Sequence, residues 1–181
     1  MVGAIGLMEY ALLTHDFSVG YVADVGSRAT PVWVTIVSLW SRLRGSILLW
    51  GFILGLYGAA FAWRLGDRFK ETAPWALAVI HGVGVFFAFL IAGVANPFAL
   101  VSPVPPDGPG PNPLLQNHIL MAVHPPFLYL GYVGMTIPFG LASAALLLLS
   151  FVRVAQADRG YAIEHVLAFD LTPAGPRYST P

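Results

Sequence analysis

The stretch PVPPDGPGPNPLLQNHILMAVHPPFLYLGYVG, at Pro103–Gly134, joins a proline-rich loop to the start of a long apolar run. It contains no lysine or arginine, and each proline fixes its own φ, so ordering the loop costs little backbone entropy. His124 stands immediately before the last two prolines. An imidazole held at a membrane face by a stiff loop is the kind of group that binds a metal or a metal-containing cofactor.

The composition indicates a membrane protein. Apolar residues make up 57% of the chain and charged residues 10%, whereas a soluble domain carries about a quarter charged residues. The charged residues also cluster outside the apolar runs, so we predict an all-α, polytopic transmembrane protein. The net charge of zero gives no indication of nucleic acid binding, and the absence of cysteine excludes disulfides and thiolate ligands.

Three apolar segments are long enough to span a bilayer: Gly45–Trp63, Ala73–Ala95 and Phe127–Val152. Each covers about 28 Å or more, which matches a hydrocarbon core of about 30 Å. Met1–Leu13 is apolar but too short to span alone, and it lacks the basic start and cleavage site of a signal peptide. We therefore predict about three full spans and a partial one at the N-terminus, formed by the end of a longer helix.

The lysines and arginines predict the orientation. They occur in Arg64–Thr72 and in the C-terminal tail, whereas Asn96–Pro126 has none, so the proline-rich loop should be external. Residues 1–152 would form the membrane domain and 153–181 a cytoplasmic, disordered tail. Three arginines contradict this orientation: Arg28, Arg42 and Arg44.

The first external region, before the first full span, is less apolar. Val32–Leu39 could form a short helix on the membrane surface, with Trp33 and Trp40 on one stripe, seven residues apart. An ordinary connector with aromatic anchoring explains the pattern equally well.

Several motifs in collinear order resemble one family. In the proline-rich stretch they are NPLLQN (Asn112–Asn117) and VHPPFLYLGYVG (Val123–Gly134). Upstream they are HDFSVGYVA (His15–Ala23), GSILLW (Gly45–Trp50) and NPF (Asn96–Phe98). Together they resemble an N-terminal portion of the heme-lyase subunit CcmF of the cytochrome c maturation system I.

That family is a large helical membrane protein that holds heme at its external face and promotes its attachment to apocytochrome c. The resemblance implies that His124 is an axial ligand of a b-type heme iron, which would be substrate or cofactor. Pro125 and Pro126 are expected at a helix start, with the imidazole at the helix mouth. Tyr129 and Tyr132 could contact the porphyrin edge, although interfacial anchoring would explain them as well. Without the resemblance, His124 could equally be bonded to loop carbonyls.

Two other histidines are weaker candidates. His118 lies six residues before His124, so the two would not share one helix face, and we interpret it as a loop residue. His81 lies inside a predicted span, where it is either functional or a neutral histidine bonded to a neighbouring helix.

The chain departs from the family in several respects. Family members are several times longer, and their tryptophan-rich WWD segment, second external histidine and two membrane histidines have no counterpart here. Arg44 replaces the usual acidic residue before the Gly-Ser pair. The chain thus resembles a fragment, one piece of a split protein or a truncated reading frame.

The predicted function is a heme-handling part of the heme lyase, which presents heme at the periplasmic face of the inner membrane and is not expected to act as an enzyme alone. Its partners would be apocytochrome c and other maturation subunits, including the heme chaperone and the apocytochrome-binding subunit. The alternative is a non-catalytic membrane scaffold or remnant without heme binding.

Overall fold

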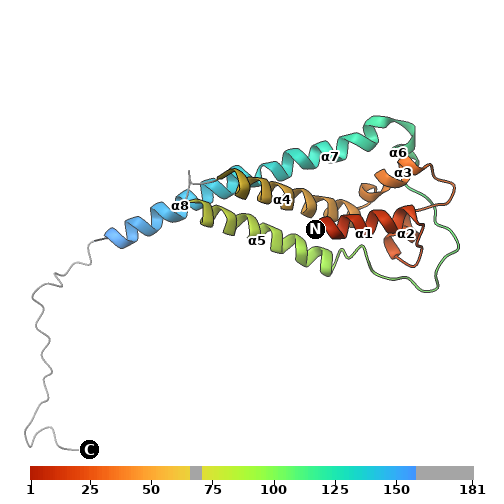
Figure 1. The fold of residues 1–181 in the computed structure, drawn as a ribbon, viewed down its shortest axis with the longest axis horizontal. Coiled ribbons are helices and arrows are strands. Elements are labelled where there is room, and N and C mark those ends of the chain that lie inside the picture. The colour runs from red at the N-terminus through yellow and green to blue at the C-terminus, as the bar shows by residue number, and fades with distance from the viewer. Residues whose placement is uncertain (66–70, 158–181) are drawn as a thin grey trace, which may run out of the picture. The chain divides into compact units, whose positions relative to one another are not determined.

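The computed structural model of the chain describes residues 1–65 and 71–157. Within these residues the only β pairing is a single antiparallel bridge between Val19 and Leu100. The remaining regular elements are helices, which confirms the predicted all-α fold (Figure 1). In chain order they are α1 (Val2–Leu13), α2 (Gly20–Val25), α3 (Val32–Val37), the 3-10 helix η1 (Ser38–Trp40), α4 (Leu43–Leu65), α5 (Ala73–Ala92), α6 (Pro113–Asn117), α7 (Ile119–Gly134) and α8 (Thr136–Gln156).

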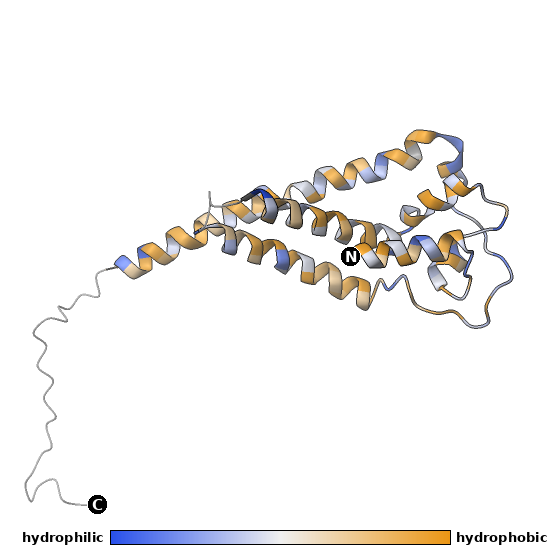
Figure 2. Cartoon of the chain, viewed as in Figure 1, coloured by the Kyte–Doolittle hydropathy of each residue, from blue (hydrophilic) through white to orange (hydrophobic). Residues whose placement is uncertain are grey.

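Among the described residues, three helical segments are long and apolar enough to cross a membrane: Leu43–Arg64, Ala73–Ala92 and Ala122–Gln156. The first two match predicted spans, and the third contains most of α7 and all of α8. α1 is a shorter apolar helix, as expected for Met1–Leu13. Figure 2 shows apolar residues along the length of α4, α5 and α8. The predicted polytopic membrane architecture is confirmed.

The C-terminal part of α8 extends beyond the predicted end of the membrane domain at Val152, and Arg153 lies in its last turn. The predicted disordered tail, from residue 158 onward, lies outside the described residues, as do Arg68 and Lys70 of the basic loop. The packing described below belongs to the compact unit Met1–Leu148.

The long helices pack through a shared apolar core. Leu49, Ile53 and Leu54 of α4 meet Ile80 of α5 and Val133 of α7. Between membrane helices such contacts stabilise mainly through van der Waals packing, which favours close approach of the backbones.

Gly140 permits such an approach between α8 and α5. A Cβ atom at this position would lie 3.1 Å from Cγ1 of Ile80 and 3.3 Å from the carbonyl oxygen of Ala76. A larger residue would therefore push the two helices apart.

A second core lies where α1 and α2 meet the start of α4, and it contains Met8, Leu12, Tyr21 and Leu48. The hydroxyl of the buried Tyr21 lies 2.9 Å from the carbonyl oxygen of Ser38 and 2.8 Å from that of Leu39. Its single proton is shared between these two acceptors in η1. The hydrogen bonds thereby join α2 to η1, while the core around Tyr21 packs this segment against α1 and α4.

The predicted short helix at Val32–Leu39 forms as α3 followed by η1. Trp33 is 46% exposed, as a surface anchor would be. Trp40 is only half-exposed, and its indole N–H donates a hydrogen bond to α7. Trp40 therefore has a tertiary contact that the seven-residue spacing did not indicate.

Candidate functional site: helix α7 around His124

Helix α7, which carries His124, begins at a histidine cap. His118 has an extended backbone conformation, and its Nδ1 accepts a hydrogen bond of 3.2 Å from the N–H of Leu120. A side-chain acceptor at this position satisfies one of the N–H groups that a helix start leaves without a partner. His118 is exposed. Because it caps the helix, its role in α7 is structural.

The expectation that Pro125 and Pro126 begin a helix is wrong. Both prolines lie inside α7, because the cap at His118 starts the helix at Ile119. His124 is consequently on the second turn of the helix and not at its mouth. A proline inside a helix has no N–H for the carbonyl four residues earlier, so Pro126 leaves the carbonyl of Ala122 without its intrahelical donor.

Trp40 supplies the missing donor. Its Nε1–H donates a hydrogen bond of 2.9 Å to the carbonyl oxygen of Ala122. An unpaired carbonyl at membrane depth costs several kcal/mol in general, so a side chain that pairs with it stabilises the helix as it stands. The Trp40 bond therefore replaces the intrahelical donor that Pro126 lacks.

Further hydrogen bonds join the same face of α7 to α4. The hydroxyl of Tyr129 donates to Ser46 Oγ at 3.1 Å, and the Ser46 hydroxyl in turn donates to the carbonyl oxygen of Trp40 in η1 at 3.0 Å. The Tyr129 ring also packs edge-on against Trp50, with the ring centroids 5.1 Å apart. Farther along, the hydroxyl of Tyr57 donates to the carbonyl oxygen of Leu130 at 3.0 Å. These bonds determine the rotation of α7 about its own axis.

His124 lies on the opposite side of the helix. Ala122, Tyr129 and Val133 form the stripe that faces α4, and His124 follows Ala122 by a rotation of about 200°. His124 is exposed. Phe127 shares its side of the helix and is 68% exposed. This part of α7 thus presents an imidazole beside a large aromatic ring.

The three predicted site residues are therefore not all together. Tyr132 is 64% exposed, as a residue in contact with a bound group would be before binding. Tyr129 instead points to α4 and bonds to Ser46. His124 and Tyr129 are separated by about 140° around the helix axis.

The remaining candidates do not join them. Nδ1 of His81 lies 2.7 Å from the carbonyl oxygen of Leu77 in its own helix. Within residues 1–65 and 71–157, no three His, Asp or Glu side chains gather as a metal site would require.

The proline-rich loop is tied to the segment that follows α2. Asp107 accepts a hydrogen bond of 3.0 Å from the N–H of Arg28 and one of 2.9 Å from the N–H of Gly108. These backbone donors favour the carboxylate form and lower the pKa of Asp107 below its ordinary value. The loop that leads to α7 is thus connected to the segment after α2.

The sequence did not indicate the contacts that Trp40 and Ser46 make with α7. A detectable signal existed, because a proline at position 126 inside a helix implies that the carbonyl of residue 122 needs another donor. The identity of that donor required the tertiary structure.

Comparison with known proteins confirms the resemblance to CcmF. A family model described as "Cytochrome C assembly protein" matches residues 40–171. The chain is 42% identical to the cytochrome c-type biogenesis protein CcmF of Pseudomonas fluorescens over 147 residues, which is 80% of the chain and 22% of that relative. It is 37% identical to CcmF of Escherichia coli K12 over 153 residues, 81% of the chain and 23% of the relative. NrfE of Haemophilus influenzae is 32% identical over 161 residues, 88% of the chain and 25% of the relative.

A solved structure of the cytochrome c heme lyase CcmF superimposes with a TM-score of 0.65 at 39% identity, and the match covers 81% of this chain and 22% of that one. The chain thus spans about a quarter or less of the length of these relatives. The family model, by contrast, covers more than half of the chain. The chain belongs to the cytochrome c assembly protein family.

Proposed function

We propose that this chain handles heme in cytochrome c biogenesis and helps present it at the external face of the membrane for attachment to apocytochrome c. His124 would be an axial ligand of the heme iron. The observation that supports this assignment most is the position of His124 on the free side of α7, opposite the stripe bonded to α4. An imidazole in that position is open to a ligand while the helix that carries it is held from behind.

The chemistry of this face fits a heme. A bound heme would supply an iron with an axial coordination position that a neutral imidazole nitrogen can occupy. Phe127 lies on the same side of α7 and offers an apolar surface to a porphyrin. The exposed Tyr132 could contact its edge. Tyr129 faces α4 and would act indirectly: through its bond to Ser46 it would set the orientation of the face that His124 occupies.

The proposed location is the inner membrane, with the proline-rich loop on the periplasmic side. The printed names of the relatives describe cytochrome c-type biogenesis and a heme lyase. By extension, we propose apocytochrome c and other maturation subunits, including the heme chaperone and the apocytochrome-binding subunit, as partners. One imidazole leaves a second axial position open, so the proposed heme would be completed by a ligand from another part of the assembly.

The structure determines which variant is a suitable control for a test of His124. His118 caps α7, so His118→Ala would weaken the helix and would not report on heme alone. His118→Asn keeps a side-chain acceptor at the cap and is the matched control. In a maturation assembly that contains this chain, His124→Ala should abolish formation of covalent cytochrome c while the chain still inserts and accumulates. His118→Asn should leave most of it.

Added imidazole should restore part of the activity of His124→Ala, because a free ligand can occupy the vacated coordination position. Full activity in His124→Ala, with normal accumulation, would refute the ligand role and favour the alternative of a membrane scaffold without heme binding. An equal loss in His124→Ala and His118→Asn would also refute it.

A further inference from the structure

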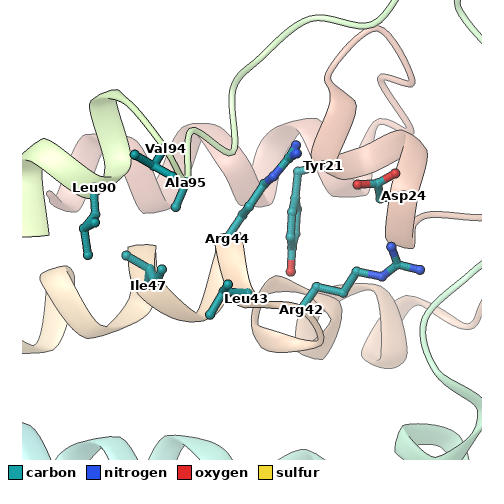
Figure 3. A pocket seen from close by; sticks show the side chains of 9 residues that line it. All are labelled: Tyr21, Asp24, Arg42, Leu43, Arg44, Ile47, Leu90, Val94 and Ala95. Atoms are coloured by element: carbon teal, nitrogen blue, oxygen red, sulfur yellow. The ribbon is translucent and has the colours of Figure 1, made fainter.

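A cavity of about 510 Å³ lies between the start of α4 and the end of α5, away from His124. Its polar wall is formed by Asp24, Arg42 and Arg44, and its apolar wall by Ile47, Leu90 and Val94. Figure 3 shows the two arginines extending from the beginning of α4 toward Tyr21 and Asp24, with Ile47 and Leu90 on the other side. The cavity is therefore amphipathic, with its charges at one end.

The position of the cavity corresponds to a membrane boundary. One candidate span, Leu43–Arg64, begins beside it, and another, Ala73–Ala92, ends beside it. Leu43 and Val94 at its edge are 72% and 82% exposed. Exposed apolar side chains next to arginines, at the ends of two spans, are typical of the depth at which hydrocarbon gives way to lipid headgroups.

The charges of the polar wall favour an anion. Two exposed guanidinium groups face one carboxylate, that of Asp24. A guanidinium presents parallel N–H donors that match two oxygens of a phosphate. Arg42 and Arg44 also lie at the end of the helices that we predict to be external, where basic residues are otherwise disfavoured. A bound anion would explain why this end of α4 tolerates them.

The floor of the cavity is rigid. The buried ring of Tyr21 is held by the carbonyls of Ser38 and Leu39. A Cβ atom on Gly45 would collide with the carbonyl oxygen of Leu39 and the hydroxyl of Tyr21, so the start of α4 lies directly against this floor. Such packing fixes the backbone at the start of α4, from which the two arginines extend.

We propose that this cavity binds an anionic glycerophospholipid. The phosphate would lie against Arg42 and Arg44, and an acyl chain would pass along Ile47 and Leu90 between α4 and α5. A free phosphate would leave this apolar wall without a partner. No histidine or methionine is among the described residues that line the cavity, so a heme iron would find no such ligand there.

The test uses the full chain, purified in a mild detergent and analysed by native mass spectrometry. The probes are dioleoylphosphatidylglycerol, dioleoylphosphatidylcholine and inorganic phosphate. Phosphatidylglycerol should give a one-to-one adduct that phosphatidylcholine does not give. Arg42→Gln and Arg44→Gln should each weaken it about fivefold, the usual effect of one basic residue at an anionic surface.

Arg64→Gln is the matched control, because Arg64 is an exposed arginine at the other end of the same helix. It should leave the adduct unchanged. Arg44→Lys, which keeps the charge but loses the paired N–H donors, should weaken the adduct less than Arg44→Gln does. Circular dichroism should show unchanged helicity in all variants.

Three results would overturn the proposal: equal loss in Arg44→Gln and Arg64→Gln, an adduct of equal strength with phosphatidylcholine, or displacement of the lipid by millimolar inorganic phosphate. The last would identify a site for a free anion. None of these results bears on His124, so this proposal and the proposed function can fail separately.

Discussion

The indole N–H of Trp40 donates a 2.9 Å hydrogen bond to the carbonyl oxygen of Ala122, which lies 82 residues later in the chain. Residue 126 would normally donate a hydrogen bond to that carbonyl, but Pro126 cannot, because proline has no N–H. A side chain from η1 thus supplies one hydrogen bond that the helix carrying His124 lacks. The bond joins a surface element to the proposed heme face.

Loss of this bond should destabilise α7. Trp40→Phe keeps an aromatic ring but removes the donor, so we expect a loss of about 1–3 kcal/mol, the cost of leaving a buried acceptor unpaired. Reversible unfolding in mixed detergent micelles would measure it. The exposed Trp33 gives the control Trp33→Phe, which should change stability by less than about 0.5 kcal/mol.

A second variant sharpens the argument. In Trp40→Phe with Pro126→Ala, the new N–H of residue 126 can bond to the carbonyl of Ala122, so the double variant should recover most of the lost stability. If the two substitutions are simply additive, Trp40 does not compensate for Pro126.

Gly45→Ala should prevent stable packing of the start of α4. The added methyl group would overlap the carbonyl oxygen of Leu39 and the hydroxyl of Tyr21. Overpacking of this kind costs about 1–3 kcal/mol, and the backbone acceptor cannot rotate away. Gly82→Ala is the control, because a Cβ atom there meets no atom within 4 Å. The midpoint of thermal aggregation in detergent should fall for Gly45→Ala and stay or rise for Gly82→Ala.

The tie between Asp107 and Arg28 should weaken in acid. Because hydrogen bonds from backbone N–H groups lower the pKa of Asp107 in the folded chain, its stabilising contribution is present above the ordinary aspartate pKa of about 4. It is lost as the pH falls through the lowered pKa of the folded state. Distances between nitroxide labels at Ala29 and Val104, measured by pulsed electron resonance, should broaden below that pH.

Asp16 provides the comparison, because its carboxylate bonds only locally, to Ser18, among the hydrogen bonds of the described residues. Asp107→Asn should make the distance distribution independent of pH, whereas Asp16→Asn should leave the pH response intact. A distribution that does not change between neutral pH and pH about 2.5 in the native chain would contradict the role of Asp107.

Cysteine labelling tests the orientation without background, because the chain has no cysteine of its own. Ser102 and Glu71 are both exposed. Glu71 lies just before α5, and Ser102 lies in the loop that follows it. An impermeant maleimide should label Ser102→Cys in spheroplasts and Glu71→Cys only after the membrane is permeabilised. The reverse pattern would invert the topology and place the loop before α7 in the cytoplasm.

The positions of the spans could be predicted from the sequence, because crossing hydrocarbon requires a continuous apolar run, and that is a local property. Gly45–Trp63 and Ala73–Ala95 were therefore located to within a few residues of α4 and α5. The motifs around His124 predicted the family for a similar reason, since they are contiguous stretches of chain.

The start of α7 and the surroundings of His124 depended on tertiary structure. Two consecutive prolines ordinarily mark a helix start, because a proline farther inside leaves a carbonyl without a donor. Whether the carbonyl that Pro126 leaves open can be satisfied depends on a distant donor, and here that donor is Trp40. Composition and motif determined that this chain is a helical membrane protein with a histidine at the beginning of its last apolar segment. Only the packing of η1 and α4 against α7 decided which way that histidine points, because the hydrogen bonds that orient the helix join residues far apart in the sequence.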